Sequence, residues 1–284
     1  MTNDSGYNVR SEVIGELMGA NDYSYAYDPI GNRLTATNNG TGWNYLSNPL
    51  NQYTNIADGV IVEPEYDLDG NMTATGDGWH YFWNGENRMI MASNTEHVVT
   101  YAYDHQGRMV SKAVNDSARH YLWDGYNIVQ ALTHSQTHTL TNSFIWGLDL
   151  SGTLQNAGGV GGLLVEVRDG EPYFAAFDAN GNVTEYLSAD GTLATHYEYS
   201  PFGELVVQSG DLADTFTHRF STKPWCAVTG QSEYEFRKYE PGMGRWLSRD
   251  PSSDTTFLAA RARGASATPE VLKRPRDQLY SSVA

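Results

Sequence analysis

The 284-residue sequence has a single cysteine, few basic residues and no long hydrophobic run. With one thiol, at Cys226, it cannot build an internal disulfide framework or a zinc site of several cysteines. Its 18 Lys and Arg against 34 Asp and Glu leave a formal net charge of −16. That charge disfavours nucleic acid or an anionic membrane surface as a partner. No stretch approaches the ~20 apolar residues that span a bilayer, and residues 1–10 lack the apolar centre of a secretion signal.

Glycine and tyrosine are abundant, at 28 and 19 residues, and both recur in a repeated unit. Copies of the pattern Tyr/Phe-Asp-x-x-Gly begin at Tyr27, Tyr66, Tyr103 and Phe177, and a looser copy begins at Tyr199. The interval from Tyr103 to Phe177 is twice the preceding one. We therefore expect one degenerate unit between them, at Tyr121–Gly125 or at Trp146–Asp149.

Each unit predicts a β-hairpin. Asp at the first and Gly at the fourth position is typical of a type I turn, in which the Asp side chain accepts backbone N–H bonds. Around the turns aromatic residues alternate, as at Tyr23, Tyr25 and Tyr27, and a period of two indicates strands with one aromatic face. A lone hairpin is only marginally stable, so successive hairpins must pair edge to edge. The sequence predicts an all-β fold, a curved and coiling antiparallel sheet of repeated hairpins over residues 20–250.

These units, with the linking segment Trp83–Met89, resemble RHS/YD-repeat proteins. The segment that begins Tyr199-Ser200-Pro201-Phe202-Gly203 and ends Gly244-Arg245-Trp246-Leu247-Ser248-Arg249-Asp250-Pro251 is similar to the RHS repeat-associated core. The resemblance divides the chain into an N-terminal lead-in (1–19), YD/RHS repeats (20–198), the core (199–251) and a variable or disordered tail (252–284).

The resemblance implies a structural role. Proteins of this kind, among them toxin-complex C components, polymorphic toxins and teneurins, coil their sheet into a shell. In the toxin-type members the shell encloses the C-terminal polypeptide, so the expected partner is the chain's own C-terminal segment or a toxin cargo. It also implies a secreted or cell-surface location, although the chain shows no signal peptide, and it implies no cofactor. With about six units, we expect a partial shell whose sheet edges pair with another copy or with a shell-completing partner chain.

The enzymatic alternative is a self-cleaving aspartyl protease. Such an enzyme needs two carboxyl groups that share one site, one ionised and one protonated. By resemblance Asp250, preceded by Arg249, is the first of the pair, while Asp254 and Asp277 are carboxylates downstream without a recognisable motif. The competing interpretation of Arg249 and Asp250 is a structural ion pair at the end of a strand.

Four other features have a plain interpretation beside a functional one. The run Gly158–Gly162 lacks a following Lys-Ser/Thr and a helix, so it predicts tight backbone packing between strands rather than a phosphate loop. His134 and His138 have no third metal ligand and are expected to be exposed loop residues. Cys226 has no neighbouring His and is expected to be buried and structural. The aromatic residues could form a glycan-binding surface, but their regular place in each repeat favours packing.

The composition changes after Pro251. Residues 252–284 carry five basic and three acidic side chains, so residues 1–251 have a net charge of −18. The tail is too short to build a core of its own. It is expected to be either an exchangeable segment lying against the shell or a disordered remnant of a broken gene.

Overall fold

A computed structural model describes residues 3–58, 61–133 and 140–251, and this part of the chain is almost entirely β. Apart from strands it contains one short 3-10 helix, η1 (Phe220–Thr222). No helix in the described ranges is long and apolar enough to cross a membrane. The chain forms two compact units, divided between Tyr81 and Phe82. The all-β prediction is confirmed, and the predicted tail, 252–284, lies outside the described residues.

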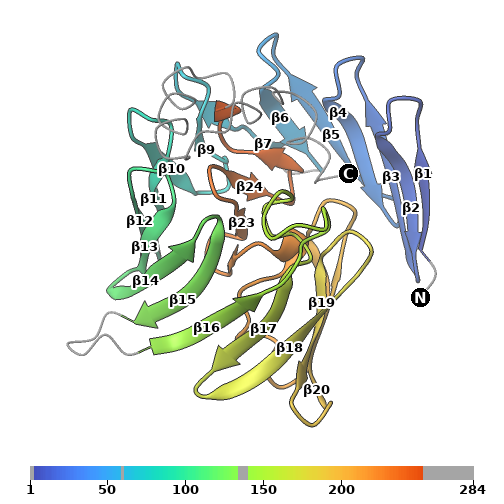
Figure 1. The fold of residues 1–284 in the computed structure, drawn as a ribbon. Helices are drawn as coiled ribbons and strands as arrows, with labels where there is room; N and C mark the ends of the chain where they lie inside the picture. The colour runs from blue at the N-terminus through green and yellow to red at the C-terminus, as the bar shows by residue number, and fades with distance from the viewer. Residues whose placement is uncertain (1–2, 59–60, 134–139, 252–284) are drawn as a thin grey trace. The chain divides into compact units, whose positions relative to one another are not determined.

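The first unit is built on a sheet whose seven strands pair antiparallel in chain order (Figure 1). Its strands are β1 (Asn3–Tyr7), β2 (Val13–Met18), β3 (Asn21–Tyr27), β4 (Arg33–Asn38), β5 (Thr41–Ser47), β6 (Tyr53–Ala57) and β7 (Ile61–Val62). Three short strands follow: β8 (Glu65–Tyr66), β9 (Met72–Ala74) and β10 (His80–Trp83), within which the chain passes into the second unit. The segment predicted as a lead-in thus contains the first hairpin of the array.

The predicted Asp–Gly turns are present. At Asp28 the carboxylate accepts the backbone N–H groups of Ile30 and Asn32, each at 2.9 Å. Gly31 closes the turn by donating its N–H to the Asp28 carbonyl at 3.2 Å, with a φ of 92° that a residue with a Cβ rarely adopts. The turns at Asp67, Asp104 and Asp178 repeat this pattern. Asp149, in the region expected for the degenerate unit, also begins one, closed by Gly152.

Asparagine begins further turns of the same kind. Asn48 accepts the N–H groups of Leu50 and Gln52, and Asn8 and Asn84 bond in the same way to the residues that follow them. With these turns included, successive turns start at Asn8, Asp28, Asn48, Asp67, Asn84 and Asp104, about 20 residues apart. The repeated structural unit is therefore one hairpin of about 20 residues. This is half the interval between the Tyr/Phe-Asp-x-x-Gly copies in the sequence.

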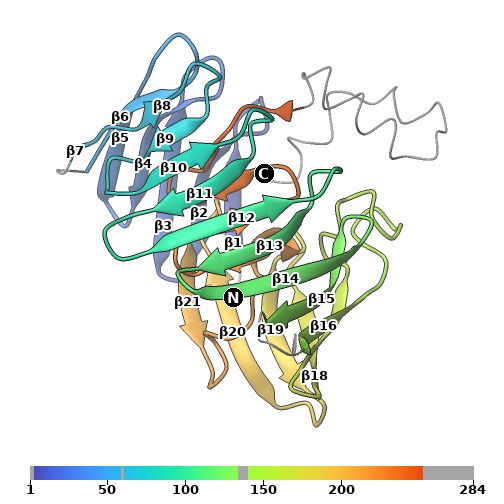
Figure 2. The same cartoon turned by 90° about the vertical axis from the view of Figure 1, so that its left-hand side faces the viewer.

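The second unit continues with strands that pair antiparallel in chain order (Figure 2). They are β11 (Met89–Ser93), β12 (Val98–Tyr103), β13 (Met109–Val114), β14 (Ser117–Asp124), β15 (Asn127–Thr133), β16 (Leu140–Trp146), β17 (Leu163–Arg168), β18 (Glu171–Phe177), β19 (Val183–Ser188), β20 (Leu193–Tyr199) and β21 (Leu205–Ser209). We refer to β11–β21 as the repeat sheet.

In several hairpins the aromatic residue before the turn ties neighbouring strands together through its polar atom. The Tyr103 hydroxyl donates to the carbonyl of Met89, the first residue of β11, at 2.7 Å. The Tyr199 hydroxyl donates in the same way to Val183, at 2.7 Å. Tyr27, Trp123 and Trp146 make the equivalent bond in their own hairpins. The position therefore favours an aromatic residue with a donor.

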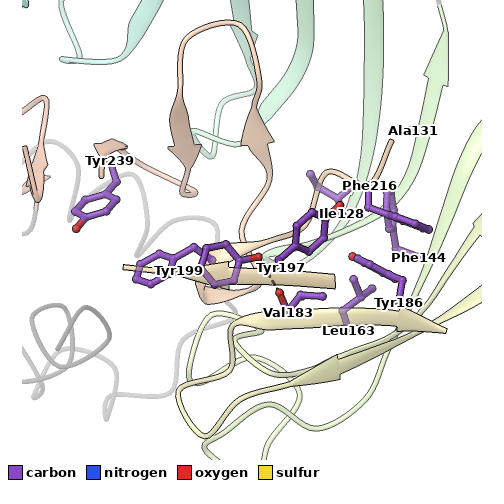
Figure 3. Packing of buried hydrophobic residues seen from close by; sticks show 11 residues of the cluster. Ile128, Ala131, Phe144, Leu163, Val183, Tyr186, Tyr197, Tyr199, Phe216 and Tyr239 are labelled. Carbon is purple, nitrogen blue, oxygen red and sulfur yellow. Dashed lines mark hydrogen bonds between the residues drawn. The ribbon is translucent and has the colours of Figure 1, made fainter. Parts of the chain in front are cut away.

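The core segment, residues 199–251, begins within the repeat sheet, whose last strand β21 it supplies, and its remainder, residues 210–251, folds back against that sheet (Figure 1). It ends in a small sheet of four short antiparallel strands: β22 (Trp225–Cys226), β23 (Gln231–Glu233), β24 (Lys238–Glu240) and β25 (Arg245–Trp246). A cluster of buried aromatic and aliphatic side chains joins the two parts (Figure 3). The ring of Phe216 stacks on Tyr186 of β19, with centroids 3.9 Å apart.

Candidate functional site

The candidate site is the contact between the core segment and the inner face of the repeat sheet. Its first part is the Phe-Ser-Thr-Lys stretch at η1, which binds the last Asp–Gly turn of the array. Ser221 donates its N–H to the Asn182 side chain at 2.7 Å, and the Thr222 hydroxyl donates to the Gly181 carbonyl at 2.7 Å. The core motif thus docks on backbone and side-chain groups that the repeat itself supplies.

Lys223 extends this contact to the glycine-rich run. Its ammonium donates to the Gly158 carbonyl at 2.6 Å and pairs with Glu235 at 2.5 Å. Gly161 donates its N–H to the Thr222 hydroxyl, and the Asp149 carboxylate accepts the N–H of Gly159. The run Gly158–Gly162 therefore makes close backbone contacts, as predicted, but it does so in the loop between β16 and β17 instead of between strands.

The second part of the site is a buried ion triad of Lys112, Glu233 and Lys238. Glu233, on β23, has a side chain only 1% exposed. One of its oxygens lies 2.8 Å from the ammonium of Lys112 on β13, and the other lies 3.2 Å from that of Lys238 on β24. The Lys238 ammonium also lies 4.1 Å from the ring centroid of Tyr101. The triad joins the small sheet to the repeat sheet through a charged contact shielded from water.

Burial and the neighbouring charges shift the pKa values of the triad in opposite directions. Burial by itself raises the pKa of Glu233, but the ammonium groups of Lys112 and Lys238 hold it below its usual value. Burial lowers the pKa of Lys112, yet the Glu233 carboxylate raises it above the ordinary value of a lysine. For Lys238 burial prevails, and its pKa is lowered. Glu233 and Lys112 thus form the tighter pair, and Lys238 is the more easily deprotonated cation.

Two more buried groups lie under the core segment. His218 is fully buried with its ring edge-on to Phe144 and Trp146, at 4.7 and 5.5 Å between centroids. Burial and the nearby Lys223 lower the pKa of His218 to about 3, so the ring is neutral at physiological pH. Arg219 lies 4.7 Å from the ring centroid of Tyr197 and donates to backbone carbonyls of the core segment.

The predicted pair Arg249 and Asp250 lies at the end of the core segment, just after β25. Arg249 is exposed. The Asp250 carboxylate forms an ion pair with Arg237, whose guanidinium nitrogen is 3.6 Å away. Arg237 in turn covers the ring of Trp246, at 4.0 Å from its centroid. The carboxylates considered as a second acid, Asp254 and Asp277, lie outside the described residues. The catalytic assignment of Asp250 and Arg249 stays a prediction.

The remaining candidates from the sequence are Cys226, His134 and His138. Cys226 is a free, buried thiol on β22, as expected for a structural residue. His134 and His138 lie outside the described residues. Within the described ranges no group of three or more His, Cys, Asp or Glu side chains could hold a metal ion.

Sequence reasoning missed Lys112, Glu233 and Lys238. Glu233 lies in Gln231–Glu233, and Lys112 is separated from it by 121 positions in the chain. The one signal available in the sequence was that Lys112 lies two positions from Val110 and from Val114, on the same face of a strand, in a protein that has few lysines. Nothing in local spacing pairs it with Glu233.

Comparison with known proteins agrees with this architecture. A family profile described as the teneurin YD-shell matches residues 1–280. The tRNA3(Ser)-specific nuclease WapA of Bacillus spizizenii is 28% identical over 235 residues, which are 80% of this chain and 9% of that protein. Teneurin-m of Drosophila melanogaster is 21% identical over 255 residues, 85% of this chain and 8% of that protein. The chain therefore spans less than a tenth of these relatives.

A solved structure of the Photorhabdus luminescens Tc holotoxin pore is also similar. It matches 90% of this chain and 17% of its own chain, with 17% identity and a TM-score of 0.48.

Proposed function

Because the chain belongs to the teneurin YD-shell family, we propose that it is a structural shell segment that holds a C-terminal polypeptide against its inner face. The resemblance to RHS/YD-repeat proteins is thereby confirmed. The observation that carries the proposal is the docking of the core segment on the repeat sheet through the buried ion triad. Asp250 forms an ion pair with Arg237, the residue before Lys238 of the triad, so the chain after Pro251 begins from the docked core segment.

The proposal extends to the cargo and its location. One curated relative is named a tRNA nuclease, and shells of this kind enclose a C-terminal effector. We assign this segment to the toxin-delivery type of shell, working in a secreted or cell-surface protein. The polypeptide after Pro251 is then the cargo or its leading end.

A site-specific protease tests this function. Its recognition sequence is inserted between Pro251 and Ser252 in one variant and before Met1 in another. If the polypeptide after Pro251 is held against the sheet, cleavage there is slower by about tenfold, the factor that ~1.4 kcal/mol of local opening produces. Cleavage is followed by gel electrophoresis under native conditions.

A matched pair of variants identifies the contact responsible. Glu233→Gln, which removes the carboxylate of the triad, should bring the two cleavage rates together. Glu171→Gln, at an exposed hairpin tip, should preserve the difference. Equal cleavage rates at the two sites in the unaltered background would refute the proposed function.

A further inference from the structure

The repeat sheet has a second face, opposite the one on which residues 210–251 pack. Tyr173 of β18 contacts Phe216 on the packed face, with ring centroids 5.1 Å apart. Successive side chains of a strand point to opposite faces, so Phe174 points away from the core segment. In the antiparallel register Phe174 lies between Val165 and Leu187. Residues directly opposite one another share a face of a sheet, so these three side chains lie in one row.

The row extends by one strand at each end. Ile145 of β16 lies opposite Val165, and Leu193 of β20 lies opposite Leu187. Ile145, Phe174 and Leu193 are 51%, 45% and 50% exposed, and the two members between them are half-buried. We call these five residues, one from each of β16–β20, the outer row. At about 4.8 Å between neighbouring strands the outer row is about 19 Å long.

An apolar row on this face calls for a partner. An antiparallel sheet with one face on a core ordinarily presents polar side chains on the other. Here five strands in succession depart from that pattern, and Val167 and Pro172, opposite each other and half-buried, widen the apolar strip. Single exposed apolar residues are ordinary on a protein surface, whereas contiguous ones mark a contact with another molecule.

The charge of this part of the chain has one sign. Residues 140–209, which contain β16–β21, have nine Asp and Glu but a single Lys or Arg, Arg168. The Arg168 guanidinium pairs with the buried carboxylate of Glu166, at 2.7 Å. Its charge is therefore balanced on the packed face of the sheet, and the surface around the outer row is acidic.

Acidic groups border the outer row on both sides. Asp169 and Asp190 are exposed in the tips of the β17–β18 and β19–β20 hairpins. Toward the opposite strand ends His196 lies between two carboxylates, 3.0 Å from Glu185 and 3.2 Å from Glu198. A partner that covers the outer row therefore meets negative charge on either side.

From the outer row and its acidic borders we propose that this face of the repeat sheet binds a basic amphipathic helix of a partner protein. A helix rises 1.5 Å per residue, so about 13 residues match the length of the row. Its apolar side chains cover the row, and Lys or Arg on its flanks pair with the borders. A second copy of this acidic chain would oppose like charges. The inference concerns the face away from the core segment and is independent of the proposed shell function.

The test uses the full chain and two fluorescein-labelled peptides, each about 14 residues long, with leucine at the same helical positions. One peptide carries lysine at the remaining positions and the other carries glutamate. Fluorescence anisotropy should show binding of the Leu/Lys peptide, with an affinity at least about tenfold higher than that of the Leu/Glu peptide. Raising NaCl from about 0.05 to 0.5 M should weaken the binding, because salt screens exposed charges.

Substitutions locate the binding face. The double variant Phe174→Thr and Leu193→Thr removes two members of the outer row but keeps strand-favouring residues. It should lower the affinity for the Leu/Lys peptide by about tenfold or more. The matched control is Leu17→Thr with Leu46→Thr, at side chains 50% and 62% exposed on β2 and β5, and it should bind as the unaltered chain does.

Hydroxyl-radical footprinting of the unaltered chain gives a readout that does not depend on the folding of a variant. The bound Leu/Lys peptide should reduce oxidation of Phe174 and Leu193 and leave that of Leu17 and Leu46 unchanged. The proposal is overturned if the Leu/Lys peptide does not bind, if both peptides bind equally, or if the bound peptide leaves the outer row as reactive as before.

Other occupants of the outer row give different results, each of which also overturns the proposal. A second copy is the occupant if sedimentation velocity shows self-association that the Phe174→Thr and Leu193→Thr variant abolishes. The chain's own tail is the occupant if that variant raises hydrogen exchange in residues 252–284. Equal affinity of this variant and the control variant would assign peptide binding to surface charge alone.

Discussion

At the scale of single residues, the polar atom of the aromatic residue before a turn bonds that hairpin to the preceding strand. Tyr103 and Tyr199 donate to the carbonyl at the start of the preceding repeat strand, and Trp123 does so with its indole N–H. A buried carbonyl without a donor costs free energy comparable to a lost hydrogen bond. Phe177 occupies the equivalent place without a hydroxyl and Ser47 without an aromatic ring, so the array does not require this bond at every turn.

The first prediction concerns Tyr103. Replacing it by Phe leaves the ring in place but removes the donor to Met89, and we expect the free energy of unfolding to fall by about 1–2 kcal/mol. Tyr7→Phe, at a side chain 53% exposed, is the matched control and should change stability by less than about 0.5 kcal/mol. Urea unfolding followed by tryptophan fluorescence measures both. Equal stabilities of the two variants would contradict the role given to the hydroxyl.

At the scale of elements, the small sheet β22–β25 depends on the repeat sheet through the buried ion triad. Removing one partner from such a contact leaves a buried charge unpaired, which typically costs 3–5 kcal/mol. The folded-state pKa of Glu233 lies below its usual value. The carboxylate therefore stabilises the folded protein at pH values above the unfolded pKa, about 4.3. That contribution is lost as the pH falls through the lower, folded pKa.

The second prediction follows from the lowered pKa of Glu233 in the folded protein. At neutral pH Glu233→Gln should lower the free energy of unfolding by about 3–5 kcal/mol, because two buried ammonium groups lose their counter-charge. As the pH falls below about 4.3 the difference from the unaltered chain should shrink, because the Glu233 carboxyl group is protonated first in the unfolded state and, at lower pH, in the folded state. Glu171→Gln, exposed at a hairpin tip, serves as the control. A difference that stays constant between pH 7 and pH 3 would argue against an ionised Glu233.

At the scale of the whole chain, negative charge is concentrated in residues 1–251, with a net charge of −18. Like charges on a folded protein repel one another, and salt screens exposed charges far more than buried ones. The buried triad is therefore much less sensitive to salt than the general repulsion.

The third prediction is that the melting temperature rises with ionic strength. Between about 20 mM and 0.5 M NaCl we expect an increase of several degrees, because the Debye length falls to a few ångströms. Charge reversal at the exposed Glu63 and Glu96 should raise the melting temperature at low salt and reduce its dependence on salt. Differential scanning calorimetry measures both, and a melting temperature independent of salt would disprove the repulsion argument.

The sequence by itself determined the all-β class, the aromatic face of the strands and the Asp–Gly turns, because each depends on spacing within one hairpin. It missed the turns begun by Asn8, Asn48 and Asn84, since asparagine makes the same bonds as aspartate but hides the period of about 20 residues. Sequence similarity to the core motif located residues 199–251 without saying what they contact.

Only the tertiary structure decided how the core segment is held. Lys112 and Glu233 are far apart in the chain, and their pairing depends on the fold bringing β13 and β23 together. The same is true of Asp250, whose partner is Arg237 rather than the adjacent Arg249. Long-range pairing of charges leaves no periodic trace in the sequence, whereas turns and strands do, because their hydrogen bonds close over a few residues.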